Sequence, residues 1–504
     1  MWMLLFYTLE AVSWVILGGL SLHCLWLLAV AAWHGRSALP EPAPFDVLPA
    51  VTVQLPVFNE RYVVERLLDA VSRLDYPRDR LEIQVLDDST DDTPQLVAER
   101  LEPLRAQGCR VSHLRRAYRA GFKAGALAEG LAASRGEFLA IFDADFVPAP
   151  DFLRRTIHHF TDPGIGMVQT RWSHLNRADS FLTRAQALML DGHFLIEQVA
   201  RSRSGTFFNF NGSAGVWRKQ AILEAGNWQA DTLAEDLDIS YRAQLQGWRF
   251  AYLPDVVVPA ELPVEMRSLK AQHHRWAQGT TQAAIKLLPA ILRSRQPLKV
   301  KLEACCHFAH WLHYPTGLLI AILIFPQLLI TRATLGVEGS VWSGVAGLGL
   351  LTSTAMFYAV SQRRAGATWW RCLLELPTLM AVGVGLALNN TRAIWQALRG
   401  VPATFHRTPK YRGQADGPRP AGYHSTLSGA KWWVTEVALG LYASAALGYA
   451  ASQSLYAIVP FLLPMSTGFL YSGLSSLAPD HLVRLGSPPF ARTGASLMSP
   501  QESL

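Results

Sequence analysis

The sequence predicts an α/β domain with a mostly parallel sheet, embedded between transmembrane helices. Hydrophobic residues make up 50% of the 504 residues and charged residues only 17%, a balance that indicates both a globular and a membrane part. The apolar residues are concentrated in 11–33 and in most of 304–473, whereas 45–300 has the composition of an ordinary globular domain. In that domain strand patterns alternate with helix patterns, which is typical of a parallel sheet with right-handed crossovers.

The N-terminal apolar segment, residues 11–33, is long enough to cross a bilayer. It has no preceding basic region and no evident cleavage site, so we expect a retained anchor within 1–36 rather than a signal peptide. Residues 37–49 are a Pro-rich linker. His34 and Arg36 follow the apolar segment, so the positive-inside rule predicts that the next domain is cytoplasmic. We expect an integral protein of the cell membrane (inner or plasma).

The cytosolic domain, residues 50–263, contains four clear strand patterns. We expect strands at 50–57, 81–86 and 110–114, and a buried strand from Phe138 that ends at Asp143. Predicted helices lie at 59–74, at 92–106 and from Gly121 onward. Amphipathic helices are predicted at 178–201 and 264–293. The second of these, in an interfacial segment of residues 264–300, would lie either on the membrane surface or on the core of the domain.

The C-terminal region, residues 301–475, contains five apolar spans, at about 305–331, 340–360, 372–391, 432–450 and 453–473. Basic loops flank the span 372–391 on both sides, and both loops have the composition of cytoplasmic ones. Because a full crossing would separate them, we expect this span to be interfacial or re-entrant. The loop 392–431 would be cytosolic, and the tail 476–504 is expected to be disordered.

The net charge of +7 does not indicate a nucleic-acid partner, because the basic residues adjoin apolar spans, at 361–371 and 392–431. The lipid bilayer accounts for this placement. The five cysteines are scattered without metal-ligand spacing, so we expect a reducing compartment and no structural zinc.

Two carboxylates, Asp143 and Asp145, follow the apolar run that begins at Phe138. Residues two apart in a strand point the same way, and ligands bind outside the carboxyl ends of strands in open α/β sheets. Paired oxygens there suit a hard divalent cation that also holds a diphosphate. Taken alone, the pair would be better explained by a polar turn.

Further polar clusters follow other predicted elements. Asp87 and Asp88 end a strand and would suit a nucleotide, although they would also cap the next helix. Lys123 begins a helix that could hold an anion, but taken alone it is better explained as a surface lysine. Glu235 and Asp236 precede a helix. Adjacent carboxylates raise each other's proton affinity, which suits a general base. The alternative is that the two residues only form the acidic first turn that helices favour.

The sequence Gln272-His-His-Arg275-Trp276 adds an indole, which could stack on a sugar, and a guanidinium, which could bind a phosphate. Ordinary helix packing would explain the pair equally well. Together with the clusters above, this motif resembles those of the family 2 glycosyltransferases of the cellulose-synthase-like group, from about Val51 to Gly279. Three segments look especially like the plant mannan and glucomannan synthase branch and its bacterial relatives: Val53–Glu60, Gln84–Thr90 and Phe210–Gly215. A fourth segment, Phe405–Lys410, is similar to the cytosolic gating loop of the group.

The resemblance implies a GT-A type domain that uses a nucleotide-diphosphate sugar with Mg²⁺ or Mn²⁺. By motif, Asp87 or Asp88 and Lys123 would contact the nucleotide. Asp143 would hold the diphosphate and, with Asp145, the metal.

The same resemblance assigns the reaction to the other clusters. Asp236 would be the general base of an inverting transfer, and Arg275 would bind the donor diphosphate. Glu235, Gln272 and Trp276 would contact the acceptor.

Asn211 would also contact the acceptor, at a position where the cellulose branch has a cysteine, which argues against cellulose as the product. The first expectation is a processive β-glycan synthase that uses UDP-glucose or GDP-mannose and feeds the glycan through its own membrane channel. A non-processive enzyme that glycosylates a lipid is the alternative. A transporter or scaffold with an inactive domain is disfavoured, because the three carboxylates Asp143, Asp145 and Asp236 are all present.

Overall fold

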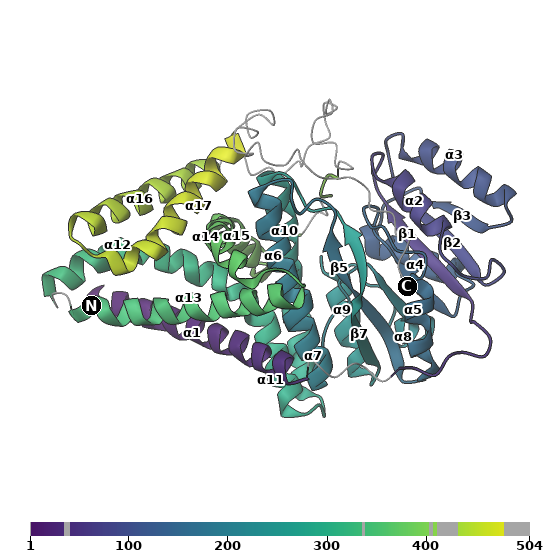
Figure 1. Cartoon of the computed structure of the whole chain (residues 1–504), viewed down its shortest axis with the longest axis horizontal. Coiled ribbons are helices and arrows are strands. Elements are labelled where there is room, and N and C mark those ends of the chain that lie inside the picture. Colours follow the sequence, from purple (N-terminus) through teal and green to yellow (C-terminus); the bar gives the residue numbers. More distant parts are fainter. Residues whose placement is uncertain (1, 35–40, 335–337, 403–406, 411–431, 478–504) are drawn as a thin grey trace, which may run out of the picture.

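The computed structural model describes residues 2–34, 41–334, 338–402, 407–410 and 432–477. A globular α/β domain lies at one end of an elongated molecule and long helices form the other end (Figure 1). The domain is built on a seven-stranded sheet in the order β3-β2-β1-β4-β6-β5-β7. Its strands are β1 Val51–Val57, β2 Leu81–Asp87, β3 Arg110–Arg115, β4 Phe138–Ile141, β5 Ile165–His174, β6 Gly215–Arg218 and β7 Arg249–Ala260.

The sheet is mostly parallel, as predicted. β1 pairs in parallel with β2 and with β4, β2 with β3, and β5 with β7. Only β6 runs antiparallel to its neighbours β4 and β5. The carboxyl ends of β1, β2 and β4 therefore meet at one edge of the sheet, where polar residues that follow them come together.

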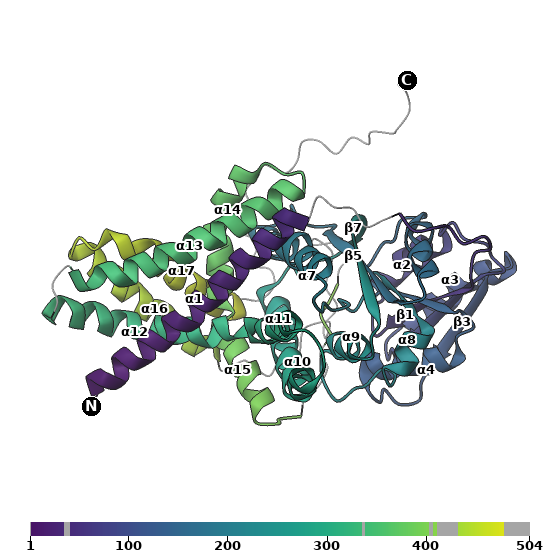
Figure 2. The same ribbon diagram turned by 90° about the horizontal axis from the view of Figure 1, so that it is seen from below.

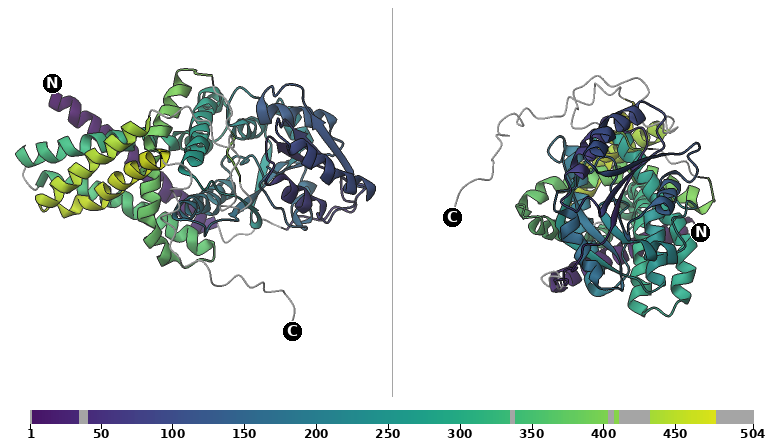
Figure 3. Two further views of the ribbon diagram at one scale, coloured as in Figure 1. Left: turned by 90° about the horizontal axis from the view of Figure 1, so that it is seen from above. Right: turned by 90° about the vertical axis from the view of Figure 1, so that its right-hand side faces the viewer.

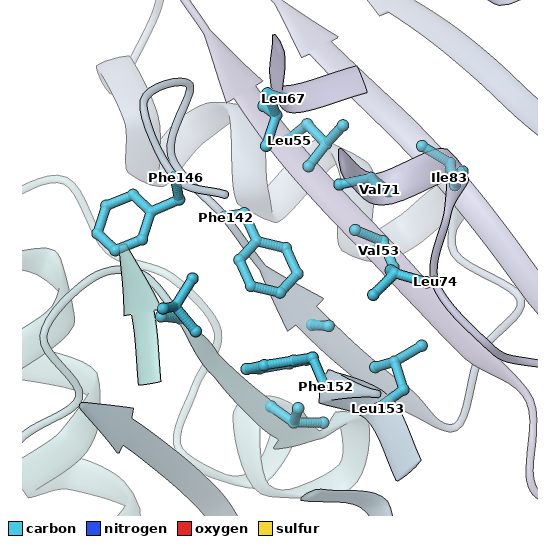
Figure 4. Close-up of a cluster of buried hydrophobic side chains, with 14 of the residues drawn as sticks. Val53, Leu55, Leu67, Val71, Leu74, Ile83, Phe142, Phe146, Phe152 and Leu153 are labelled. Carbon is cyan, nitrogen blue, oxygen red and sulfur yellow. The ribbon is translucent and has the colours of Figure 1, made fainter. Parts of the chain in front are cut away.

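Helices cover both faces of this sheet and bury two apolar clusters against it. They are α2 Val64–Ser72, α3 Thr93–Ala106, α4 Phe122–Ala133, α5 Phe152–Ile157, α7 Gln198–Ser204, α8 Lys219–Glu224 and α9 Glu235–Leu245. In the first cluster Phe142 packs edge-to-face on Phe152 with ring centroids 4.9 Å apart (Figure 4). Each fully buried side chain of this kind stabilises the fold by about 1.5–3 kcal/mol.

Two predicted boundaries are wrong, and both bear on the pocket. The helix predicted at 59–74 begins only at Val64, because Asn59 is left-handed, with φ of 56°, and residues 61–63 form a turn. The strand β4 ends at Ile141 and not at Asp143. Asp143 and Asp145 therefore lie in a turn beyond the strand, and the alternation of side chains in a strand does not explain how they converge.

The long helices form a bundle beside the domain. They are α1 Trp2–His34, α11 Leu298–Ala309, α12 His313–Thr334, α13 Glu338–Arg364, α14 Trp369–Gly385, α15 Ala387–Leu398, α16 Trp432–Ser452 and α17 Val459–Leu477. Among the described residues, four segments are long and apolar enough to cross a membrane: Met3–His34, Leu298–Ile330, Trp432–Ser452 and Tyr456–Ser476. Figure 2 shows α1 running diagonally along this bundle from the N-terminus to the domain.

The predicted interfacial or re-entrant span corresponds to α14 and α15, which are bent by 41° relative to each other. This geometry is that of a broken span or a re-entrant segment. Predicted residues 178–201 form α6 Phe181–Gly192, a π-helical turn His193–Glu197 and α7 in one continuous rod.

The helix α10 Met266–Arg293 connects the two parts of the molecule. It packs against α9 of the domain and against α11, α15 and α17, and it lies between the sheet and the bundle (Figure 3). Of the two alternatives for this segment, the structure favours a helix packed on protein. Its motif residues are thereby brought to the wall of the domain that faces the bundle.

Candidate active site

One pocket brings together ten of the eleven residues that the sequence analysis singled out. It lies beyond the carboxyl ends of β1, β2 and β4 and is closed on one side by α10. The ten residues in its lining are Asp88, Lys123, Asp143, Asp145, Asn211, Glu235, Asp236, Gln272, Arg275 and Trp276. They come from segments up to 188 residues apart, Asp88 to Trp276, so the fold and not the chain sequence assembles them.

Asp87 is the residue that the structure leaves outside the pocket lining. It is buried at the end of β2, where it accepts hydrogen bonds from Ser89 N at 2.8 Å and from His113 Nε2 at 2.8 Å on the neighbouring strand. Burial alone would raise its pKa, but these hydrogen bonds hold the pKa of Asp87 below its ordinary value. Asp88 instead lines the pocket and pairs with Arg116 at 2.5 Å.

Lys123 and Asp143 form an ion pair at the start of α4, with Nζ 2.5 Å from Oδ1. The helix is preceded by Gly121, whose φ of 68° turns the chain into the first turn. Lys123 also donates to the carbonyl of Gly212 at 2.9 Å. Burial lowers the pKa of Lys123, but Asp143 and Glu235 outweigh this effect and keep the pKa above its ordinary value. The ammonium is therefore a permanent positive charge in the pocket wall.

Asp145 accepts hydrogen bonds from Glu261 N at 3.0 Å and from Lys410 Nζ at 2.8 Å. Within the described residues, no group of three or more His, Cys, Asp or Glu side chains could hold a metal ion by itself. Mg²⁺ and related cations at diphosphates use one or two carboxylates and take their other ligands from phosphate and water. The carboxylates of Asp143 and Asp145, in one pocket with open space between its walls, fit such a cation.

Asp236 and Glu235 occupy the first turn of α9. Burial and the neighbouring negative charge of Glu235 raise the pKa of Asp236 to about 7. Burial likewise raises the pKa of Glu235. The Asp236 carboxylate accepts a hydrogen bond from Leu237 N at 2.8 Å, which fixes its orientation. A carboxylate with a pKa near neutrality is a competent general base.

From α10, Gln272, Arg275 and Trp276 line the opposite wall. Burial lowers the pKa of Arg275, and Glu235, Asp143 and Asp236 oppose that shift. A guanidinium remains charged under all ordinary conditions. The pocket thus combines cationic side chains, which suit phosphate oxygens, with carboxylates that suit a cation and a proton.

Sequence reasoning missed five charged residues of the pocket: Arg119, Glu261 and three that form ion pairs between distant segments. Glu60 forms a bidentate pair with Arg407, at 2.9 and 3.0 Å, and burial raises the pKa of Glu60 to about 7 in spite of that partner. Lys410 contacts Asp145, as described above. All three lie in segments that carried the family resemblance, which was the available signal. Phe405 and His406 of the same segment lie outside the described residues.

Comparison with known proteins gives matches for the α/β domain. Residues 49–279 match a family described as "Glycosyltransferase like family 2". Glucomannan 4-beta-mannosyltransferase 2 of Arabidopsis thaliana is 46% identical over 253 residues, which are 49% of this chain and 47% of that protein. Glucomannan 4-beta-mannosyltransferase 1 of Oryza sativa subsp. japonica is 44% identical over 268 residues, 51% of each chain. The chain spans about half the length of these curated relatives.

A solved structure supports the fold. The mannosyltransferase PcManGT from Pyrobaculum calidifontis, solved in complex with GDP-Man and Mn²⁺, has a TM-score of 0.55 and 24% sequence identity to this chain. The alignment covers 78% of this chain and 100% of that protein. The predicted GT-A type fold is therefore confirmed.

Proposed function

Because the chain belongs to glycosyltransferase family 2 through residues 49–279, we propose that it is an inverting, metal-dependent hexosyltransferase that builds a β-glycan. The observation that carries this proposal is the convergence, in one pocket, of Asp236, whose pKa is raised to about 7, with the carboxylates of Asp143 and Asp145, which we propose hold the cation. Such a pocket can deprotonate a sugar hydroxyl and hold a diphosphate leaving group at the same time.

The donor that we propose is GDP-mannose. Two relatives that are 44–46% identical over the matched region are named mannosyltransferases. The structural neighbour was solved in complex with GDP-Man and Mn²⁺. UDP-glucose, the other donor considered from the sequence, becomes the comparison in the assay.

In the proposed mechanism Lys123 and Arg275 bind the anionic diphosphate, and Trp276 offers an aromatic face to the acceptor sugar. Mg²⁺ or Mn²⁺ held by Asp143 and Asp145 would supply Lewis-acid stabilisation of the leaving group. Asp236 takes the proton of the acceptor hydroxyl as its oxygen attacks the anomeric carbon from the face opposite the diphosphate. That displacement breaks the donor bond, forms the new glycosidic bond and inverts the configuration.

The apolar helices that flank the catalytic domain suggest how the product leaves the pocket. The chain would be an integral protein of the cell membrane with 1–36 as an anchor, 50–263 as the cytoplasmic catalytic domain, 264–300 as the connecting helices and 301–475 as a bundle. Four apolar helical segments support it, or five if α14 and α15 form one span. Because α10 lies between domain and bundle, a growing glycan at the pocket would leave next to the membrane helices. We therefore propose processive extension coupled to translocation.

The deciding experiment uses purified full-length protein in nanodiscs with Mn²⁺ and labelled GDP-mannose or UDP-glucose in parallel. We expect label from GDP-mannose in a high-mass, mannanase-sensitive product, and Asp236→Asn should lower transfer by roughly 10²-fold or more while nucleotide-sugar binding persists. Label confined to the lipid extract would identify a glycolipid as the product and exclude the polymer. Wild-type turnover by Asp236→Asn would remove the assignment of the base.

A further inference from the structure

We propose that His193 is a positioning residue for the acceptor side of the pocket: together with Gln198 it holds the Asn211 amide so that the amide presents an N–H donor to the acceptor sugar. The inference rests on the proposed glycosyl transfer and concerns the same site. Asn211 lines the pocket, whereas His193 stands behind it and is not part of the lining. The sequence motifs give no indication of this role.

The orientation of the Asn211 amide follows from its two side-chain partners. Gln198 Nε2 donates to Asn211 Oδ1 at 2.6 Å and to the backbone carbonyl of Asn209 at 3.0 Å. Because a backbone carbonyl can only accept, the amide of Gln198 has one possible orientation. Asn211 must then turn its carbonyl toward Gln198 and its Nδ2 toward His193, whose Nε2 lies 2.8 Å away.

This arrangement also determines the tautomer of the histidine. The amide nitrogen of Asn211 cannot accept, so His193 Nε2 must be the acceptor and the proton must be on Nδ1. His193 Nδ1 lies 3.0 Å from Glu197 Oε2, which accepts that proton in a hydrogen bond. Burial raises the pKa of Glu197, but Arg201 and His193 hold it well below its ordinary value, so the carboxylate is an anion.

Glu197 is in turn held by other charged side chains. Arg201 donates to Glu197 Oε2 at 3.2 Å and to Glu303 Oε1 at 2.8 Å. Glu303 in turn lies 2.8 Å from His23 Nε2 of the anchor helix α1. The imidazole is thus held by a chain of hydrogen bonds and ion pairs that ends in the membrane bundle. Such support is what a side chain needs to hold another side chain in a fixed orientation.

The backbone explains why two residues of one helix can reach the same amide. His193–Glu197 is a π-helical turn between α6 and α7, and Gln198 N donates to His193 O within it. In an α-helix the residues that share a face are three and four apart, so positions 193 and 198 would diverge. The wider π turn, with its i→i+5 bonding, brings them to one side, and such turns frequently mark functional sites.

These contacts make the Asn211 side chain a hydrogen-bond donor in this wall of the pocket. One Nδ2 hydrogen of Asn211 is used by His193, and among the described residues the other has no protein partner. Asn211 therefore offers a donor to a hydroxyl or ring oxygen of the acceptor sugar, while its side-chain carbonyl already accepts from Gln198. Without the imidazole acceptor, only the bond from Gln198 to Oδ1 would hold the amide, and its Nδ2 could tilt away from the acceptor sugar.

The test compares full-length His193→Phe and His193→Gln, with His159→Phe as the matched control because His159 lies outside the pocket lining. Acceptor KM is measured with a β-1,4-linked manno-oligosaccharide, donor KM with GDP-mannose, and oligosaccharide Kd by calorimetry. His193→Phe should raise acceptor KM and Kd roughly tenfold, about 1.4 kcal/mol, with donor KM unchanged. His193→Gln, which keeps an acceptor oxygen, should restore most of the loss.

A double-mutant cycle with Asn211→Ala gives the decisive comparison. Since His193 is proposed to act only through Asn211, the double variant should be no worse than Asn211→Ala alone. Wild-type acceptor constants in His193→Phe, or parallel losses in donor KM, kcat and thermal stability, would overturn the inference and leave the proposed function intact.

The binding measurement separates the two proposals. Oligosaccharide binding that depends on His193, in a wild-type protein that transfers no mannose or glucose, would support the inference and refute the proposed function. Absence of both binding and transfer in the wild-type protein would refute both.

Discussion

The substitution Gly212→Ala tests how closely the pocket is built around Asp236. Gly212 has φ of 84°, where a side chain costs roughly 1–2 kcal/mol. A Cβ added there would lie 3.0 Å from Asp236 Oδ2 and 3.5 Å from Lys123 Nζ. The first distance is shorter than van der Waals contact, so the Asp236 carboxylate has to move by some tenths of an ångström. Since a misplacement of about 1 Å can lower a rate by about 10²-fold, we expect a loss of roughly tenfold in kcat.

Gly108→Ala is the matched control. Gly108 has a similar φ, 80°, but a Cβ there would meet nothing within 4 Å. Both variants should lose stability by about 1–2 kcal/mol, seen as similar decreases in Tm, but only Gly212→Ala should lose transfer. Initial rates with labelled GDP-mannose and thermal unfolding of both proteins provide the comparison. If Gly212→Ala retains wild-type kcat, or if Gly108→Ala loses just as much, the Asp236 carboxylate is not held as the structure indicates.

Three further outcomes are expected. Asp88→Asn should raise donor KM, whereas Asp87→Asn should lower stability by about 1–3 kcal/mol and spare the KM of the folded enzyme; the reverse pattern would exchange their roles. Because the pKa of Asp236 is raised to about 7 and only its deprotonated form accepts a proton, kcat/KM should rise as pH increases through that value and then level off; a flat profile would contradict the assignment. EDTA should abolish transfer and Mn²⁺ or Mg²⁺ should restore it, and full activity after chelation would exclude the metal.

The sequence was sufficient for the parts of the fold that depend on local pattern. The strands β1 to β4 and the helices near them follow hydrophobic periodicity, whereas β5, β6 and β7 were not predicted. The polar residues after β2 and β4 follow from where those strands end. The predicted boundaries at Asn59 and Ile141 were both wrong. For the strand that ends at Ile141, the reason is burial. Apolar residues such as Phe142 and Phe146 continue into the core after the strand has ended, so burial alone cannot locate the last ladder hydrogen bond.

Partners that are distant in sequence could not be predicted. Glu60 pairs with Arg407 and Asp145 with Lys410, across separations of 347 and 265 residues. Nothing in the local pattern of either segment specifies the other. The π turn at His193 was not predicted either. Gly192 directly precedes it, but a single Gly inside a helical pattern is tolerated and does not by itself indicate a change of helix type.

The charges of the pocket indicate that donor and cation should bind together. Asp143 is paired with Lys123 and Asp145 with Lys410. A divalent cation at both carboxylates, bound alone, would leave two ammonium groups without their counterions in a partly desolvated site, which is costly. A diphosphate bound alone would face carboxylates of like charge. If both bind, Asp143 and Asp145 would hold the cation and the two ammonium groups would hold the diphosphate, so that every charge would keep an opposite partner. The affinity for Mn²⁺ should therefore increase when the nucleotide is present, and by linkage the affinity for the nucleotide should increase by the same factor when Mn²⁺ is present.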